Sequence, residues 1–352
     1  MNQVTVVVPG PISTRTGGFI YDRHIAEGLR RRGWTVTVVE LDPVTHPLAP
    51  PLDSASPQFG AIPDHSTVLI DGLAFGTMPE IIEREAWRIR FVPIVHMPLS
   101  ATPGLTRGDG AWLSNLERRA LKHARHVIIT GQRSRAQVMT MAGWTDPSQV
   151  TRIPPGSRRP AALTTRAEGP SVRILCVANV TQGKGYDILL QALARIADIG
   201  WTLTCVGNEE REPQTATRLR ALAQELGIAT RVVWRGELDD RALETAYAEA
   251  DLFALATRSE TYSMAVADAI AHGVPVVSTR TGEIPSIVGE AGLLASPGDV
   301  AEFGAMLAKA LSDPAVRQTL RARARDAART LPTWDEASDA MAGVLTRVTE
   351  HG

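Results

Sequence analysis

Three charged side chains lie in segments that suit the binding of a diphosphate. Lys184 stands between two glycines before a predicted helix, and such a loop offers backbone N–H groups and a mobile cation to a phosphate. Glu260 precedes an alanine-rich helix predicted over about residues 263–271, and Asp268 lies inside that helix, with seven residues between the two acids. The unpaired N–H groups and dipole of a helix start attract a diphosphate. The pattern predicts that Glu260 reaches past the phosphates and that Asp268 accepts two ribose hydroxyls.

The same residues also have a simpler interpretation. Glu260 and Asp268 fit a surface glutamate and a helix-facing aspartate in an ordinary strand–helix–strand unit. Lys184 fits a solvated lysine after a turn. The spacing by itself leaves both interpretations open.

Two more candidate features lie in the first third of the chain. Gly17 and Gly18 directly precede a helix predicted over residues 19–32. His96 follows an apolar run at residues 91–95, and open parallel sheets bind ligands at the carboxyl ends of their strands. A flexible turn at the glycines and a loop histidine bonded to backbone are the alternatives. As a ligand contact, His96 would suit a pH-sensitive hydrogen bond.

The stretch from residue 256 to residue 285 resembles the EX7E signature of the retaining GT-B glycosyltransferases of the large family 4. Glu260 takes the place of the first acid, Tyr262 that of the aromatic residue, and Gly273 and Pro275 lead into the next strand. The loop around Lys184, the glycine pair and His96 are also similar to segments of that family. The resemblance spans nearly the whole chain, is strong over 173–295 and is weak over 41–125.

Four positions depart from the family pattern. Asp268 is one methylene shorter than the second acid of the signature, and Thr261 and Ser263 replace two glycines. Asn179 stands where the phosphate loop of the family has an arginine, so one of two expected cations is missing. The first three changes leave the identity of the donor sugar open.

The resemblance implies roles for these residues. Lys184, with the backbone at residues 263–264 and 17–18, would stabilise the diphosphate as it leaves, and Glu260 would orient the donor sugar. His96 would face the sugar or the acceptor. The expected catalytic residues are Glu260, Lys184 and His96. The expected donor-binding residues are Gly17, Gly18, Asn179, Lys184, Gly207, Glu237, Leu238, Glu260, Tyr262, Ser263, Met264 and Asp268.

The order of predicted elements defines the fold class. Strands and helices alternate on both sides of a stretch rich in proline, arginine and alanine, which predicts two α/β, Rossmann-like domains. The resemblance implies that these form a GT-B fold with the site in the cleft between them. The expected bounds are 1–158 for an acceptor domain, 159–170 for a linker and 171–332 for a nucleotide-sugar domain. A closing helix, 333–352, is expected to pack on the first domain.

Composition excludes several other classes of protein. The 352 residues carry a net charge of −1, which indicates neither a nucleic-acid partner nor an anionic membrane. No apolar run is long enough to span a bilayer, and the N-terminus lacks the features of a secretion signal, so a cytoplasmic location is expected. Cys176 and Cys205 lie in apolar runs and are expected to be buried thiols.

These observations predict a retaining glycosyltransferase that transfers a hexose from a nucleoside-diphosphate sugar, with UDP expected, to a hydroxyl of a small molecule, glycan or lipid. The nucleotide sugar would be a co-substrate, with no cofactor and, since no D-x-D motif occurs, no metal. One alternative is a degenerate GT-B module that binds a nucleotide sugar without transfer. Another is a different GT-B enzyme, such as an epimerase or a glycoside phosphorylase. The missing G-x-G-x-x-G disfavours an NAD-dependent dehydrogenase. The sugar, the acceptor and the oligomeric state do not follow from the sequence.

Overall fold

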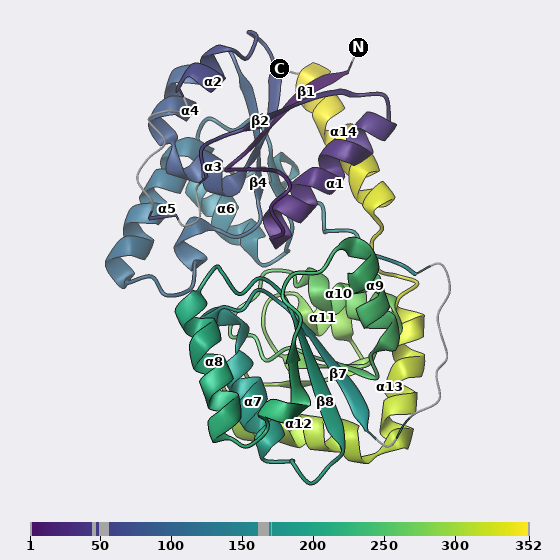
Figure 1. Ribbon diagram of the computed structural model, residues 1–352. Helices are drawn as coiled ribbons and strands as arrows, with labels where there is room; N and C mark the ends of the chain where they lie inside the picture. The colour runs from purple at the N-terminus through teal and green to yellow at the C-terminus, as the bar shows by residue number, and fades with distance from the viewer. Residues whose placement is uncertain (1, 44–46, 49–55, 161–168, 170, 351–352) are drawn as a thin grey trace. The chain divides into compact units, whose positions relative to one another are not determined.

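The computed structural model describes residues 2–43, 47–48, 56–160, 169 and 171–350. The chain divides into two compact units, Met1–Gly156 with Pro332–Gly352, and Ser157–Leu331 (Figure 1). Each unit contains a six-stranded sheet whose neighbouring strands run parallel. The prediction of an α/β chain with two Rossmann-like units is confirmed. Most of the expected linker, residues 161–168 and 170, lies outside the described residues.

The first unit has the strand order β2-β1-β3-β4-β5-β6. Its strands are β1 (Gln3–Val8), β2 (Thr35–Glu40), β3 (Thr67–Asp71), β4 (Arg90–Val95), β5 (Val127–Ile129) and β6 (Val150–Arg152). Its helices are α1 (Gly17–Arg31), α2 (Ser56–Gly60), α3 (Gly72–Thr77), α4 (Pro79–Glu85), α5 (Arg107–Leu121), α6 (Ser134–Ala142) and α14 (Trp334–Glu350).

Both faces of the sheet are buried at its central strands β3 and β4, as is usual for parallel strands covered by helices, whereas the edge strand β2 is partly exposed. Successive side chains of a strand point to opposite faces. Leu69 therefore packs in a core that includes residues of α1 and α14, whereas its neighbours Val68 and Ile70 pack in a second core with residues of α3 and α4. The strands read as continuous apolar runs for this reason.

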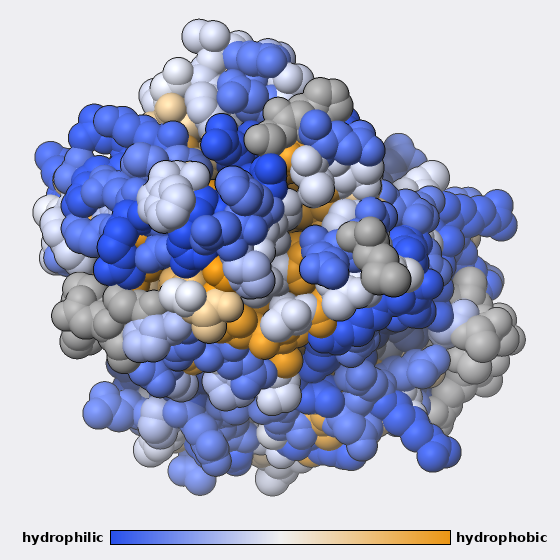
Figure 2. Space-filling view, turned by 90° about the horizontal axis from the view of Figure 1, so that it is seen from above, coloured by the Kyte–Doolittle hydropathy of each residue, from blue (hydrophilic) through white to orange (hydrophobic). Residues whose placement is uncertain are grey.

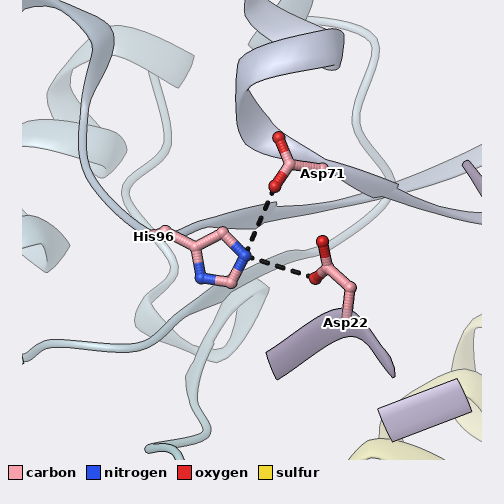
Figure 3. A group of neighbouring side chains, drawn as sticks. All are labelled: Asp22, Asp71 and His96. Carbon is pink, nitrogen blue, oxygen red and sulfur yellow. Dashed lines mark hydrogen bonds and ion pairs between the residues drawn. The ribbon is translucent and has the colours of Figure 1, made fainter. Parts of the chain in front are cut away.

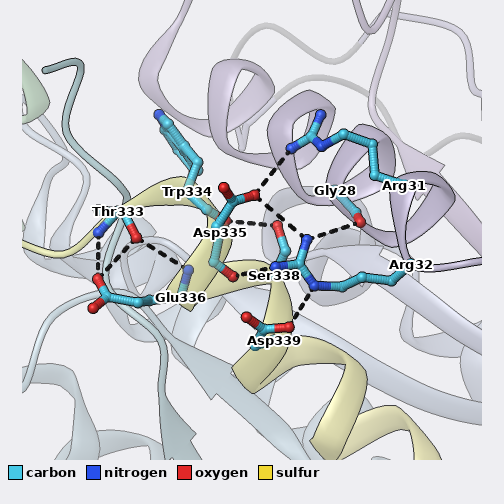
Figure 4. Close-up of polar contacts among 9 residues, drawn as sticks. All are labelled: Gly28, Arg31, Arg32, Thr333, Trp334, Asp335, Glu336, Ser338 and Asp339. Carbon is cyan, nitrogen blue, oxygen red and sulfur yellow. Dashed lines mark hydrogen bonds and ion pairs between the residues drawn. The ribbon is translucent and has the colours of Figure 1, made fainter. Parts of the chain in front are cut away.

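The C-terminal helix α14 packs along α1 (Figures 1 and 4). Thr333 and Glu336 cap its start reciprocally, each side chain accepting a hydrogen bond from the backbone N–H of the other. Gly28 makes the close approach possible, because a Cβ there would lie 1.9 Å from the Ser338 hydroxyl. Arg32 donates to the Asp339 carboxylate over 2.6 Å at the edge of the contact. Helix α14 is therefore part of the first unit although the whole second unit precedes it in sequence.

The second unit has the strand order β12-β11-β10-β7-β8-β9. Its strands are β7 (Val172–Val177), β8 (Trp201–Val206), β9 (Val232–Trp234), β10 (Leu252–Ala254), β11 (Val276–Thr279) and β12 (Gly292–Ala295). Its helices are α7 (Tyr186–Ala194), α8 (Pro213–Glu225), α9 (Asp240–Glu249), α10 (Met264–Ala271), α11 (Ile284–Val288), α12 (Val300–Ser312) and α13 (Pro314–Ala327).

Each sheet has one point at which the strand order reverses. In the first unit the chain runs from β1 out to β2 and returns to β3 on the other side of β1. In the second unit it runs from β7 through β8 to β9 and returns to β10 on the other side of β7. Ligands of open α/β sheets bind beyond the carboxyl ends of strands at such a point. The loops after β1, β3, β7 and β10 are therefore the places to examine.

Some predicted elements differ in detail from the structure. Residues 42–66 are predicted to be loop throughout, but α2 lies inside that range. A helix predicted over residues 79–88 is shorter, because α4 ends at Glu85, and α3 precedes it without having been predicted. The sequence of α3 (GLAFGT) contains two glycines, which weaken its helical signal. Asp71 nevertheless caps α3 by accepting a hydrogen bond from Leu73 N over 2.7 Å.

The surface is polar on the face shown in Figure 2, where hydrophilic residues surround a smaller hydrophobic area. In the described part of the chain, few large apolar side chains are exposed, and Trp87 at 76% is the most exposed of them. No helix within the described ranges combines the length and the hydrophobicity that crossing a bilayer requires.

Candidate functional site

Lys184 and Glu260, the two predicted catalytic residues of the second unit, form an ion pair. Lys184 Nζ lies 2.5 Å from Glu260 Oε1. Lys184 follows β7 and Glu260 follows β10, so the pair lies at the switch point of this sheet. The lysine side chain is 30% exposed and the glutamate 11%, which leaves the cation accessible to a ligand. The structure thus brings together two residues that lie far apart in the sequence.

Close backbone contacts hold the two loops against each other. Gly185 has φ +66°, and a Cβ there would lie 1.9 Å from the carbonyl oxygen of Ala256. Gly282 has φ +53°, and a Cβ there would lie 2.1 Å from the carbonyl oxygen of Glu260. A side chain at Gly185 or at Gly282 would therefore clash with the backbone of the loop that carries Glu260. Arg258 adds an ion pair of 2.7 Å to Asp187 at the start of α7.

A second group lies after β7, β8 and β9. Asn179 Oδ1 accepts a hydrogen bond from Asn208 N over 3.3 Å, and Asn208 Nδ2 donates to Glu237 over 3.0 Å. Gly207 precedes Asn208, and a Cβ at Gly207 would lie 1.9 Å from the carbonyl oxygen of Ala178. Three predicted donor-binding residues, Asn179, Gly207 and Glu237, are thus neighbours. Leu238 is half-buried against the core of the unit.

Asp268 is 6% exposed on α10, with its carboxylate engaged inside the unit. Its Oδ1 accepts a hydrogen bond from the backbone N–H of Arg158 over 2.8 Å. Burial raises the pKa of Asp268 to about 6, although the Arg158 hydrogen bond and charge oppose that rise. One carboxylate oxygen is therefore already bonded at the position predicted to hold a ribose.

The start of α10 carries an unusual serine. Ser263 has φ +75°, a conformation that L-residues other than glycine rarely adopt. Its hydroxyl is buried and has no hydrogen-bond partner, and it does not cap the helix. Tyr262 is buried in the core, and Met264 is the first residue of the helix. The backbone conformation explains why the family pattern has glycine where this chain has Ser263.

His96 of the first unit lies between two aspartates that sequence reasoning did not assign to the site (Figure 3). Its Nε2 is 3.2 Å from Asp22 Oδ1 and 3.4 Å from Asp71 Oδ2. Asp22 comes from α1, Asp71 ends β3, and His96 follows β4. We call Asp22, Asp71 and His96 the carboxylate–histidine cluster. The alternative of a loop histidine whose side chain bonds only to backbone is thereby wrong.

The glycine pair has two distinct environments. A Cβ at Gly18 would lie 3.2 Å from His96 Cδ2 and 3.6 Å from Asp71 Oδ2, whereas a Cβ at Gly17 would meet nothing within 4 Å. A side chain at Gly18 would therefore crowd His96 in the carboxylate–histidine cluster. Asp22 lies one helical turn after Gly18, on the same face of α1. The sequence did offer a signal for Asp71 as a site residue, because it ends a strand that was predicted to be buried.

Burial sets the protonation of this cluster. Burial raises the pKa of Asp22 to about 7, against the lowering effect of His96. Burial also disfavours the charged form of His96, but the charges and hydrogen bonds of Asp22 and Asp71 outweigh it and raise the pKa of His96 to about 10. His96 is then a cation at neutral pH and cannot accept a proton as a general base.

The cluster also has the donor types that metal ions use, since one atom from each of the three residues lies within 4.8 Å of the others. In this structure the three side chains engage one another, with His96 Nε2 at 3.2 Å from Asp22 Oδ1 and 3.4 Å from Asp71 Oδ2. The two cysteines are buried and not disulfide-bonded. Burial raises the pKa of Cys176 to about 12 and also raises that of Cys205, which makes both poor nucleophiles.

Sequence reasoning missed Asn208, Arg158, Asp22 and Asp71 as site residues. Asn208 had a usable signal, because it directly follows a strand and a glycine. Arg158 had none, because it lies in a segment without regular structure and acts through its backbone N–H. Asp22 looks like a surface residue of α1 in the sequence, yet it is 1% exposed.

Comparison with known proteins identifies the second unit. Residues 171–313 match the model of the family described as "Glycosyl transferases group 1". The "D-inositol 3-phosphate glycosyltransferase" of Xylanimonas cellulosilytica is 31% identical over 203 residues, which are 56% of this chain and 48% of that protein. The "Mannosylfructose-phosphate synthase" of Agrobacterium fabrum is 29% identical over 169 residues, 46% of this chain and 37% of that protein. The chain spans about half the length of the curated relatives it matches.

Solved structures extend the likeness to the whole fold. Sucrose-phosphate synthase from Thermosynechococcus elongatus superposes with a TM-score of 0.80 at 20% identity, covering 100% of both chains. Anabaena HepE in complex with UDP-glucose superposes with a TM-score of 0.74 at 18% identity, covering 98% of this chain and 99% of that one. The chain has the GT-B glycosyltransferase fold, and residues 171–313 of its second unit match the glycosyl transferases group 1 family.

Proposed function

We propose that this protein is a retaining glycosyltransferase that uses a UDP-linked hexose as donor. The observation that carries the proposal is the Lys184–Glu260 ion pair at the switch point of the second sheet. The family match over residues 171–313 covers both residues. Support for the nucleotide comes from HepE, whose structures hold UDP and UDP-glucose.

The proposed reaction exchanges one C–O bond for another at the anomeric carbon. The bond from that carbon to the β-phosphate oxygen breaks, and a bond to the acceptor hydroxyl forms on the same face. The acceptor proton passes to the leaving phosphate oxygen. Lys184 would turn from Glu260 to the diphosphate as negative charge develops there, which is electrostatic stabilisation of the transition state. Glu260 would then accept hydrogen bonds from donor-sugar hydroxyls.

We also propose that this charge is neutralised without a divalent metal. Lys184 and the N–H groups at the start of α10 would supply the compensating positive charge. Donor turnover should then be equal in EDTA and in added magnesium. A loss of turnover in EDTA that magnesium restores would contradict this part of the proposal.

The acceptor is proposed only as a hydroxyl-bearing small molecule, glycan or lipid. Two of the relatives are named for phosphate-bearing products or acceptors, an inositol phosphate and a mannosylfructose phosphate. A panel of sugar and inositol phosphates, with the matching unphosphorylated compounds, is therefore the first acceptor screen.

A second candidate is a GT-B module that binds a nucleotide sugar but does not transfer it. The observation that favours it is that Asn179 and Asp268, which both depart from the family pattern, are already hydrogen-bonded to Asn208 and Arg158. Consumption of UDP-glucose separates the candidates, because a transferase hydrolyses its donor slowly even without an acceptor.

The experiment that tests the main proposal is a thermal-shift panel with UDP, GDP, ADP, TDP and NAD. A ligand that binds only the folded state raises the melting temperature. We expect a shift with UDP that is lost in Lys184→Ala and retained in Lys309→Ala, which changes the same charge on α12. Folded protein that shows no shift with any nucleoside diphosphate would overturn both candidates.

A further inference from the structure

The carboxylate–histidine cluster places two acids against the same nitrogen of one imidazole. Asp22 Oδ1 and Asp71 Oδ2 both face His96 Nε2, and the other ring nitrogen, Nδ1, points away from both carboxylates (Figure 3). An ionised carboxylate only accepts hydrogen bonds, so Nε2 must carry the proton that lies between them. The proton on Nε2 and the ring orientation of His96 are thereby fixed, and a second proton on Nδ1 makes the ring a cation.

The three side chains of the carboxylate–histidine cluster differ in how far they are exposed to solvent. Asp22 is 1% exposed and the Asp71 side chain 7%, whereas the His96 side chain is 23% exposed. The acids are therefore shielded from water while the imidazole can be reached by a ligand. Asp22 Oδ2 is also buried without a hydrogen-bond partner, and the neighbouring Asp71 raises the pKa of Asp22, whereas the charge of His96 lowers it. Such a carboxyl favours a cation beside it.

The other neighbours of the ring carry no opposing charge. Tyr21 lies edge-on to the imidazole with ring centroids 5.2 Å apart, and its hydroxyl donates to the carbonyl of Ile153. Thr130 donates to the backbone carbonyl of His96. Gly18 lies against the ring edge, where any side chain would crowd it. The described contacts thus present two acids and no base to His96.

We propose that Asp22 and Asp71 are positioning residues that hold His96 as a cation with Nδ1–H presented to a hydroxyl or phosphate oxygen of a bound substrate. His96 then binds and orients that oxygen and does not act as a general base. The cationic state of His96 stands on the two carboxylates at Nε2 together with the raised pKa of the ring, whereas the contact to a substrate rests on the proposed glycosyltransferase function. The measured pH response of the ring nitrogens decides the first part without any substrate.

The test is a long-range ¹H–¹⁵N NMR titration of the histidine side chains between about pH 5 and pH 11, assigned with His96→Gln. We expect both ring nitrogens of His96 to stay protonated through the range where ordinary histidines titrate, near pH 6.5. The charges and hydrogen bonds of the two acids hold its pKa near 10, against the lowering effect of burial. Titration of wild-type His96 at the ordinary value would overturn the proposal, whether or not any variant folds.

Two variants locate the cause. Asp22→Asn keeps the shape and removes the charge, and we expect it to lower the His96 midpoint by about two pH units. Thr130→Val is the matched control, because it removes a hydrogen bond to the His96 backbone without changing any charge, and it should leave the midpoint in place. Equal midpoints in all three proteins would overturn the role of Asp22.

The substrate contact is tested on the same spectra with UDP and with UDP-glucose. A shift of the Nδ1 resonance with UDP-glucose alone assigns the contact to the sugar, and a shift with both assigns it to the nucleotide. Thermal shift with UDP-glucose but no change at His96 leaves the proposed function intact and overturns the contact for donors. If a phosphate-bearing acceptor then also leaves the Nδ1 resonance unchanged, the proposed contact between His96 and a substrate is wrong.

Discussion

The two units place different charges at equivalent points of similar sheets. In the second unit the loops after β7 and β10 present a lysine and a glutamate that are partly open to solvent. In the first unit the histidine after β4 lies against two shielded aspartates, one in α1 and one at the end of β3. The first pair is a mobile cation with a partner that it can exchange for a phosphate. The second group is a cation fixed by partners that it cannot leave without stranding a buried carboxylate.

The physical basis of the difference is burial. The Lys184 side chain is 30% exposed, so water can solvate its ammonium when it moves away from Glu260, which is 11% exposed. A buried acid that loses its cation pays a desolvation cost of several kcal/mol. The second unit is therefore suited to a charge that must move during a reaction, and the first to one that must stay in place.

The largest expected effect concerns the mobile cation. Lys184→Ala should lower donor turnover about 100-fold, because a group that neutralises a leaving charge typically contributes that much. Stability should fall by about 1–3 kcal/mol, because the substitution leaves Glu260, which is 11% exposed, without its cation. Steady-state kinetics with chemical denaturation checks both. Normal turnover in the folded variant would remove Lys184 from the reaction and with it the contrast between the two sites.

A second prediction concerns the buried acid Asp268, for comparison with the acids Asp22 and Asp71 that lie beside His96. Asp268→Asn should raise the free energy of unfolding by about 2 kcal/mol at pH 8 and by little at pH 4. The folded-state pKa of Asp268 is raised to about 6 from 3.8, so the wild type loses stability as pH rises between these values. Asparagine can still accept the hydrogen bond from Arg158 N.

The control for this prediction is Asp240→Asn. Asp240 also pairs with Arg158, at 3.1 Å, but its side chain is 59% exposed. Its substitution should change stability by less than about 0.5 kcal/mol at either pH. The free energies of unfolding of wild type and Asp268→Asn are measured by urea denaturation at both pH values. A difference between them that does not change with pH would show that ionisation of Asp268 does not destabilise the fold.

A smaller effect is expected at the start of α10. Ser263→Gly should raise stability by about 1 kcal/mol, because it relieves a positive φ and removes an unpaired buried hydroxyl. Ser278→Ala is the matched control, since that buried serine donates to the Leu255 carbonyl over 2.8 Å and its loss should cost about 1 kcal/mol. If Ser263→Gly also weakens UDP binding, the hydroxyl serves the donor site. A higher melting temperature for Ser263→Gly and a lower one for Ser278→Ala would confirm the two predicted changes in stability.

The smallest effect separates the two glycines of the first unit. Gly17→Ala should raise stability by a few tenths of a kcal/mol, up to about 1, because alanine favours the helix and meets no neighbour. Gly18→Ala should lack that gain, because its Cβ would press on His96. The His96 NMR signal should move only in Gly18→Ala. If both variants weaken UDP binding equally, the glycine pair serves the phosphates as well as the packing.

Sequence patterns predicted the elements more fully than the partners within each site. The positions of β7, β8 and α10 follow from apolar runs and alanine-rich periodicity, which are local signals. The failure at α3 follows from two glycines in a helix that tertiary packing stabilises. The partners of Asp268 and His96 had no local signal, because Arg158 lies 110 residues from Asp268 and Asp22 lies 74 residues from His96.

The sequence by itself determined the two α/β units, the loop that carries Lys184 and the spacing of Glu260 and Asp268. These features depend on residue types within a few turns of chain, where periodicity and glycine placement act directly. Only the tertiary structure decided which charges meet. It paired Lys184 with Glu260 and enclosed His96 between Asp22 and Asp71, because the return of the chain across each sheet brings together the ends of strands that are distant in sequence.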